Sequence, residues 1–170
     1  AGMLAWLLVG IGGLFLTLPH SAWLLFIATG SIVYLGLFLS RFTGENLMAK
    51  DRPRNPFDIL FLLTVVMALA VFSIAIPFFL VDPTSLPLTV GILTGLMWIP
   101  LSWSLQHWIG LAHGLGRTVA VLAAWYAFPD QRFVVVPFLI VALYAVTIAV
   151  LERRWRTLGN SPGGREPAMG

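Results

Sequence analysis

Arg117 interrupts the apolar segment HWIGLAHGLGRTVAVLAAWY, residues 107–126, with a full positive charge. At 100° per residue, one helical face about 120° wide contains His107, Gly110, His113, Gly114 and Arg117. A guanidinium can hold an anionic group, and a neighbouring imidazole can share hydrogen bonds with it. Two positive groups four residues apart repel each other, so we expect His113 to be neutral near pH 7.

The elements that position this charge must be membrane helices. The chain has 170 residues, of which 59% are hydrophobic and only 10% are charged. A soluble domain usually has roughly a quarter of its residues charged. Residues 1–40, 59–81, 83–116 and 133–151 contain no Asp, Glu, Lys or Arg. A membrane span needs about 20 apolar residues, and lipid offers the backbone no hydrogen bonds, so the spans must be helical.

We therefore predict an all-α, polytopic integral membrane protein. Residues 1–156 would form one six-helix transmembrane bundle, and residues 157–170 a disordered cytoplasmic tail. The spans are expected at about 3–18, 22–40, 57–81, 86–103, 107–128 and 133–151. Because the connections are short, neighbouring helices should run antiparallel.

Basic residues set the predicted orientation. Those near apolar segments are Arg41, Lys50, Arg52 and Arg54 after the second span, and Arg153, Arg154 and Arg156 after the sixth. Cytoplasmic loops carry such an excess, so we expect both termini in the cytoplasm. The positions of the tryptophans agree with this orientation. We expect Trp6, Trp103, Trp108 and Trp155 at the inner interface, Trp23 and Trp125 at the outer one, and Trp98 inside the bundle.

Arg117 should lie near the bilayer centre, midway between Leu105 and Pro129. An arginine there costs about 2.5–3.5 kcal/mol on insertion scales and needs partners. No carboxylate has a matching depth. The partners left open are backbone carbonyls freed by Pro77 and Pro100, water, an anionic ligand, and the midspan hydroxyls. Those hydroxyls belong to Thr29, Ser31, Tyr34, Thr94, Tyr144 and Thr147.

Glycines predict how closely the helix around Arg117 is packed. Gly110 and Gly114 are four residues apart on the face that carries the charge, and Gly91 and Gly95 repeat that spacing in the preceding span. Small residues at this spacing let two helix backbones approach each other closely. We expect these four glycines to pack the two helices together.

Two functions remain open from these residues. In the first, the protein is a transporter, channel or carrier that binds a polar or anionic group near the bilayer midplane. Its ligand-binding residues would be Arg117, His113, Tyr34, Tyr144 and Thr94. In the second, it is a non-catalytic membrane subunit or scaffold, in which Arg117 stabilises the bundle by binding carbonyls or hydroxyls.

Several chemistries are disfavoured by what the sequence lacks. There are no cysteines, which excludes disulfides and thiolate catalysis. The histidines do not lie at one depth on facing helices, as a bis-histidine haem requires, and three or four converging metal ligands cannot be assembled. The only lysine, Lys50, is in a loop, so a retinal Schiff base is excluded. We expect no catalytic residues, no metal and no cofactor. A lipid-acting enzyme ranks third among the functions, since no acid–base pair or metal set is visible.

Three runs resemble an uncharacterised family of small six-helix bacterial inner-membrane proteins. They are LPHSAWLLFIATG (18–30), LTVGILTGLMWIPLSW (88–103) and FPDQRFVVVPFLIV (128–141). The resemblance implies a bacterial inner-membrane location and brings no activity. The expected partners are the lipid bilayer and an anionic lipid or small solute, with a homo-oligomer or a larger membrane complex as the assembly. No nucleic-acid motif is present.

Overall fold

The described residues form helices joined by turns. The structure is a computed structural model that describes the chain except residues 33, 35–37, 39–62, 64–65, 68 and 160–170. Over this part of the chain it has no β-strand, which confirms the all-α class there. The elements are α1 (Gly2–Phe15), α2 (Leu18–Gly30), α5 (Phe72–Val81), η1 (Pro83–Ser85), α6 (Leu86–Leu96), α7 (Trp98–Leu105), α8 (Ile109–Ala127), η2 (Pro129–Gln131) and α9 (Arg132–Gly159).

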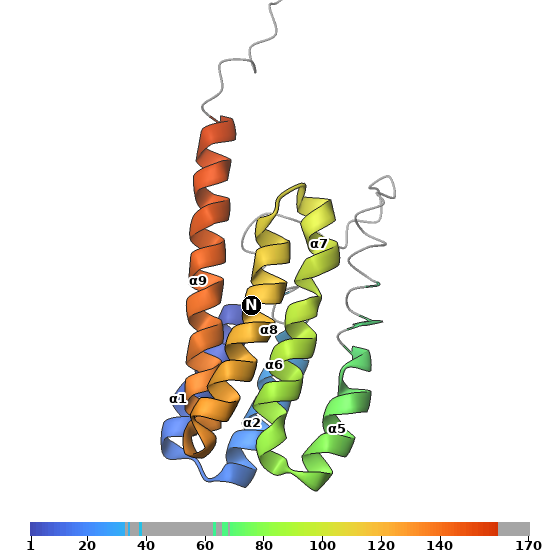
Figure 1. Cartoon of the computed structure of the whole chain (residues 1–170), viewed down its shortest axis with the longest axis vertical. Helices are drawn as coiled ribbons and strands as arrows, with labels where there is room; N and C mark the ends of the chain where they lie inside the picture. The colour runs from blue at the N-terminus through green and yellow to red at the C-terminus, as the bar shows by residue number, and fades with distance from the viewer. Residues whose placement is uncertain (33, 35–37, 39–62, 64–65, 68, 160–170) are drawn as a thin grey trace, which may run out of the picture.

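The helices form one bundle in which the chain reverses direction between α1 and α2, α5 and α6, α7 and α8, and α8 and α9 (Figure 1). α1 packs along α9, α8 contacts both α9 and the α6–α7 pair, and α2 packs against α1. At one end, called the lower end below, the chain turns from α1 to α2, from α5 to α6 and from α8 to α9. The upper end contains the α7–α8 turn and the last turns of α9.

Prolines begin the helices at the lower end. We expected Pro19 to close the first span and the second to start at residue 22, and this boundary is wrong. α1 already ends at Phe15, and α2 begins at Leu18 with Pro19 in its first turn. Proline is tolerated there because the first N–H groups of a helix have no intrahelical partner anyway. Pro83 and Pro129 likewise begin η1 and η2.

The predicted span 86–103 is divided into α6 and α7 at Met97. Pro100 has no N–H to donate to the carbonyl of Leu96, and its ring crowds that carbonyl, which explains a break at this place. Met97 keeps helical dihedral angles, so the chain direction continues. Together with η1, the two segments form one apolar stretch, Pro83–Trp103.

A tight turn at the upper end starts α8. Gln106 adopts a left-handed conformation with φ 48°, which reverses the chain after α7. Ser102 donates to the carbonyl of His107 at 2.7 Å, and Arg154 of α9 donates to the carbonyl of Leu105 at 2.7 Å. These bonds fix the start of α8 against both α7 and α9.

The last helix is longer than its predicted span. α9 runs from Arg132 to Gly159, whereas we expected a span at 133–151 and a disordered tail from residue 157. Residues 157–159 of that tail are therefore helical. The rest of the predicted tail, residues 160–170, lies outside the described residues.

Two stretches of the described residues are long and apolar enough to cross a membrane, Pro83–Trp103 and Pro129–Thr157. α1 and α5 are apolar but shorter. By length and composition these two stretches weakly suggest membrane association, while the six-span arrangement stays a prediction. About a third of each of the predicted spans 22–40 and 57–81 lies outside the described residues.

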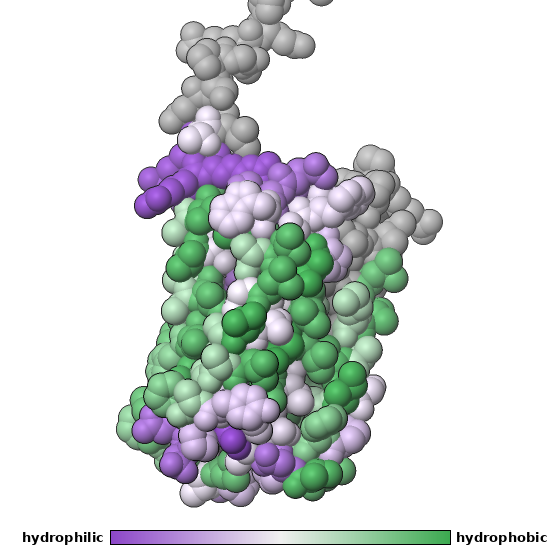
Figure 2. All heavy atoms as spheres, in the orientation of Figure 1, coloured by the Kyte–Doolittle hydropathy of each residue, from purple (hydrophilic) through white to green (hydrophobic). Residues whose placement is uncertain are grey.

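The core lies where α1, α2, α6, α8 and α9 meet. Its largest fully buried apolar side chains are Trp6, Val9, Leu25, Leu86, Val90, Val121, Val136 and Ile140. Large apolar side chains also cover much of the outside, including Leu8, Leu115 and Val119. Figure 2 shows hydrophobic residues over the middle of one face of the molecule, between hydrophilic residues at its two ends.

Candidate functional site

Arg117 lies near the middle of α8 and is completely buried, with 0% of its surface exposed. Its side chain meets residues from three further helices: Trp6 of α1, Thr94 of α6 and Tyr144 of α9. We call this group the Arg117 centre. One side chain thus connects four helices in the middle of the bundle.

Hydroxyl groups accept the hydrogen bonds of the Arg117 guanidinium. Nη2 donates to Oγ1 of Thr94 at 2.9 Å, and that hydroxyl donates in turn to the carbonyl of Val90 at 2.5 Å. Nη1 donates to the hydroxyl of Tyr144 over a longer distance of 3.5 Å. The predicted carbonyls near Pro77 and Pro100 are not its acceptors in the described structure.

Two aromatic rings also contact the charge. The guanidinium carbon lies 5.2 Å from the ring centroid of Trp6 and 5.6 Å from that of Tyr144. A cation is attracted to the face of an aromatic ring, more strongly where water is excluded. These rings therefore stabilise the positive charge without neutralising it.

No carboxylate neutralises Arg117 within the described part of the chain. The ion pairs found there join Arg132 to Asp82 and Arg156 to Glu152, both at the ends of the bundle. The Nε atom of Arg117 is also buried and has no hydrogen-bond partner in this part of the structure. The centre therefore has an uncompensated charge and an unused N–H donor.

His113 lies one turn before Arg117 and is buried. Its Nδ1 lies 2.8 Å from Oγ1 of Thr147, whose hydroxyl donates to the carbonyl of Leu143 at 2.8 Å. Because that hydroxyl proton is already used, Nδ1 must carry the proton and donate to Thr147. Nε2 of His113 is then an acceptor, and it has no partner among the described residues.

The His113 ring packs between two aromatic rings. Its centroid lies 4.5 Å from that of Trp98 and 4.9 Å from that of Tyr144. Trp98 and Tyr144 themselves meet edge to face at 5.8 Å. Tyr144 thus contacts both His113 and Arg117 and joins the two polar side chains into one cluster.

Glycines let α8 approach α6 and α7 closely enough to form this cluster. A Cβ atom on Gly95 would lie 2.8 Å from Cδ of Arg117, and one on Gly110 would lie 2.7 Å from the carbonyl oxygen of Trp98. A Cβ on Gly114 would lie 2.9 Å from Ile99, and one on Gly91 would lie 3.3 Å from Val121. All four glycines named from the sequence lie in this helix contact.

The structure brings together four of the five ligand-binding residues named from the sequence: Thr94, His113, Arg117 and Tyr144. Tyr34 is 75% exposed and does not belong to the buried cluster. Trp98 packs inside, as expected from its depth.

Trp6 was expected at the inner interface, and that prediction is wrong, because its side chain is fully buried beside Arg117. The buried residues of α1 are Ala5, Trp6, Val9 and Gly10. Their spacing of three and four residues marks a core-facing stripe. α1 is apolar on all its faces, so its sequence does not show which face is internal.

A second arginine organises the lower end. Arg132 donates from Nη1 to Oγ1 of Thr84 and from Nε to the carbonyl of Trp125 at 3.2 Å. Its guanidinium carbon lies 3.7 Å from the ring centroid of Trp125. Its Nη1 lies 4.0 Å from Oδ2 of Asp82. Trp125 completes the network by donating from Nε1 to the carbonyl of Thr84 at 3.2 Å. We call these residues the Arg132 network.

Asp82 is held in its charged form by this network. Its carboxylate accepts from the Thr84 hydroxyl at 2.7 Å and from the Thr84 N–H at 2.8 Å. The Thr84 hydroxyl lowers the pKa of Asp82 most, and the Thr84 backbone and the positive Arg132 lower it further. Hydrogen bonds to a carboxylate favour its ionised form.

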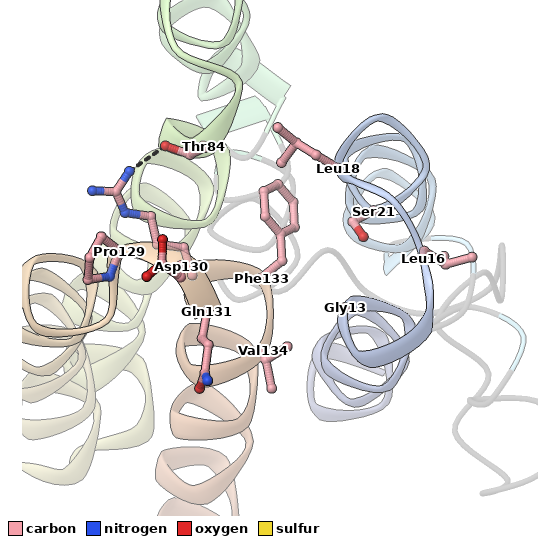
Figure 3. A pocket seen from close by; sticks show the side chains of 11 residues that line it. Gly13, Leu16, Leu18, Ser21, Thr84, Pro129, Asp130, Gln131, Phe133 and Val134 are labelled. Atoms are coloured by element: carbon pink, nitrogen blue, oxygen red, sulfur yellow. Dashed lines mark hydrogen bonds between the residues drawn. The ribbon is translucent and has the colours of Figure 1, made fainter.

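A pocket of about 150 Å³ lies beside the Arg132 network, between the α1–α2 turn and the start of α9 (Figure 3). No group of three or more His, Asp or Glu side chains in the described residues could hold a metal ion.

A family model described as a family of unknown function, DUF7010, matches residues 1–154. This match confirms the sequence-based resemblance to an uncharacterised family. No curated protein and no solved structure matches the chain. The comparisons supply no activity, so function has to be argued from the geometry of the Arg117 centre.

Proposed function

The chain belongs to the family of unknown function DUF7010, and we propose that it is a multi-pass membrane protein that binds an anionic group beside Arg117. It would act as a transporter, channel or carrier. The ligand would be a small carboxylate, phosphate or inorganic anion, because guanidinium groups bind such groups through paired N–H donors.

The surface of the bundle supports a membrane location. Two apolar stretches have sufficient length, and apolar side chains cover the middle of the molecule (Figure 2). Exposed tryptophans lie near both ends: Trp103, Trp108 and Trp155 towards the upper end and Trp23 towards the lower end. Tryptophan favours the two membrane–water interfaces, so this arrangement fits a bilayer between them.

The upper end would face the cytoplasm of a bacterial inner membrane. Arg153, Arg154 and Arg156 lie at the upper end of α9. The sequence adds further basic residues in the segment 41–54, which lies outside the described residues. With six spans, the positive-inside rule then places both termini in the cytoplasm.

The observation that carries the binding proposal is the uncompensated charge of Arg117. A buried guanidinium without a carboxylate is costly, and an anion would remove that cost. The unused Nε–H of Arg117 is a further donor for such a ligand. The long bond to Tyr144 is the contact that an entering anion could replace most easily.

A second function is favoured by a different observation. Arg117 has no exposed surface, and its neutral partners come from α1, α6 and α9. In this reading the protein is a non-catalytic membrane subunit or scaffold, and Arg117 joins its helices together.

Anion flux from proteoliposomes separates the two functions. We would load chloride, nitrate, phosphate or acetate and compare the wild-type protein with Arg117→Gln. Losing one charge-assisted bond of about 1.5–3 kcal/mol should lower flux at least about tenfold, with little change in thermal stability. Arg153→Gln is the matched control, since it removes the same charge from an exposed position at the upper end and should keep flux.

The subunit or scaffold function predicts the opposite pattern. The wild-type protein would then move none of the four anions, and Arg117→Gln would accumulate poorly or melt at a clearly lower temperature. Equal flux from wild-type protein and Arg117→Gln would also reject anion binding at this site.

A further inference from the structure

The pocket at the lower end has a separate chemical character from the Arg117 centre and shares no residue with it. Its volume is about 150 Å³, and it is lined by Gly13, Leu16, Leu18, Ser21, Thr84 and residues 129–134. In Figure 3, Thr84 and Asp130 lie across from Ser21 and Gly13, with Phe133 between them. The two sides therefore come from different turns of the chain.

Asp130 brings an unpaired negative charge to this pocket. Its carboxylate lines the pocket and has no hydrogen bond or ion pair within the described residues. The carboxylate that faces Arg132 is that of Asp82, at 4.0 Å, and Asp82 does not line the pocket. The negative charge of Asp130 is therefore available to a ligand.

Arg132 brings a positive charge to the same pocket. Its Nη1 and Nε atoms donate to Thr84 and to the Trp125 carbonyl, which fixes the guanidinium in place. Nη2 has no hydrogen-bond partner in the described part of the chain, so its N–H groups are unused. A fixed guanidinium loses little freedom when it binds, which favours recognition of an anionic group.

The two helix ends at the pocket carry partial charges, one negative and one positive. α1 ends at Phe15, close to the lining residues Gly13 and Leu16, and its last carbonyls give that side a partial negative charge. α2 begins at Leu18, and its first N–H groups give that side a partial positive charge. Because the two helix ends meet in one turn, their opposite partial charges largely offset each other.

We propose that this pocket binds a small zwitterion made of a primary ammonium group and a phosphate or carboxylate. The ammonium group would donate to Asp130, and the anionic group would accept from Nη2 of Arg132. With about 30 Å³ for each water in liquid, the pocket has room for about five waters, which suits a group the size of phosphoethanolamine. A quaternary ammonium has no N–H to donate to Asp130 and should be rejected.

Two kinds of ligand have this combination of groups: a lipid headgroup at the membrane surface and a free solute. We would reconstitute the full chain in nanodiscs of phosphatidylcholine and titrate O-phosphoethanolamine by calorimetry, with phosphocholine as the comparison. Native mass spectrometry would then measure which lipid is retained from equal mixtures of phosphatidylethanolamine, phosphatidylcholine and phosphatidylglycerol. Binding of soluble phosphoethanolamine identifies a free solute, and selective retention of phosphatidylethanolamine alone identifies a lipid.

Asp130→Asn should weaken whichever binding is seen about tenfold, because it replaces a charge-assisted bond by a neutral one. Glu152→Gln is the matched control: it removes the same charge at the upper end, away from the pocket, and should leave binding unchanged. The proposal is overturned if neither probe is preferred over its choline counterpart. Equal weakening by the two variants would also overturn it, since net charge rather than contact with Asp130 would then explain binding.

Discussion

Arg117 and Arg132 each donate to a threonine and contact at least one aromatic ring, yet in the described part of the chain only Arg132 has a carboxylate that neutralises its charge. Arg132 lies at the lower end, where Asp82 faces it at 4.0 Å and its side chain keeps 17% of its surface exposed. Arg117 lies in the middle of the bundle with no exposed surface and no carboxylate among the described residues. The same side chain thus has a charged partner in one place and only neutral partners in the other.

The difference follows from the cost of burying charge. A carboxylate at the bundle surface keeps part of its hydration, whereas one placed beside Arg117 would have to lose nearly all of it. Neutral hydroxyls and aromatic faces need no such desolvation and still stabilise a guanidinium. Arg117 can therefore exist with neutral partners, and it retains a charge that a ligand could bind.

The threonines that accept from each arginine give the sharpest test of this comparison. Thr94→Val should leave a buried guanidinium N–H without an acceptor and destabilise the fold by about 3 kcal/mol. Thr84→Val should cost about 1 kcal/mol or less, since Asp82 and water can take over the bond at the surface. Thermal or denaturant unfolding in detergent measures both.

Two conservative variants control this test. Thr94→Ser and Thr84→Ser keep the hydroxyl and should restore most of the stability in each place. Equal destabilisation by the two valine variants would show that the buried and the surface arginine depend on their threonines alike, and the comparison would fail.

Gly95 tests how tightly the Arg117 centre is packed. Gly95→Ala would place a Cβ 2.8 Å from Cδ of Arg117 and push the guanidinium away from Thr94, so we expect a loss of about 2 kcal/mol. Gly116→Ala on α8 is the control, because a Cβ there meets nothing within 4 Å. Alanine favours helix over glycine, so that variant should be neutral or slightly stabilising. Unfolding curves that rank the two alanine variants equally would contradict a tight centre.

Much of the Arg117 centre could be predicted from the sequence because depth along a helix is a simple count of residues. Thr94 and Tyr144 were expected at the depth of Arg117, and both accept hydrogen bonds from it. Residue count gives depth but not rotation about the helix axis. Tyr34 therefore had a suitable depth and still points outward, with 75% of its surface exposed.

The Arg132 network and the lower pocket could not be predicted in the same way. They depend on how three turns meet in space, and turn geometry is set by side-chain contacts between distant segments, such as Trp125 with Thr84. From the sequence we also expected Pro19 to follow a helix, whereas it lies in the first turn of α2.

Asp82 provides the smallest expected effect and tests the surface side of the comparison. Its pKa in the folded protein lies below the ordinary value of about 3.8, chiefly because Thr84 donates to its carboxylate. The unfolded chain then binds a proton at higher pH than the folded one, so the stabilisation is fully present above about pH 3.8 and is lost as pH falls through the lower folded value. The carboxylate is 44% exposed, which keeps the effect small.

Melting temperatures between about pH 7 and pH 3 should therefore show a small acid-dependent loss in the wild-type protein that is reduced in Asp82→Asn, with the two curves converging at low pH. Thr94→Val removes no titratable group and should therefore show the same acid-dependent loss as the wild-type protein. An acid-dependent loss of equal size in wild-type protein and Asp82→Asn would place the titrating group elsewhere. The contrast between a charge-paired surface arginine and an unpaired buried one would then lose its support from Asp82.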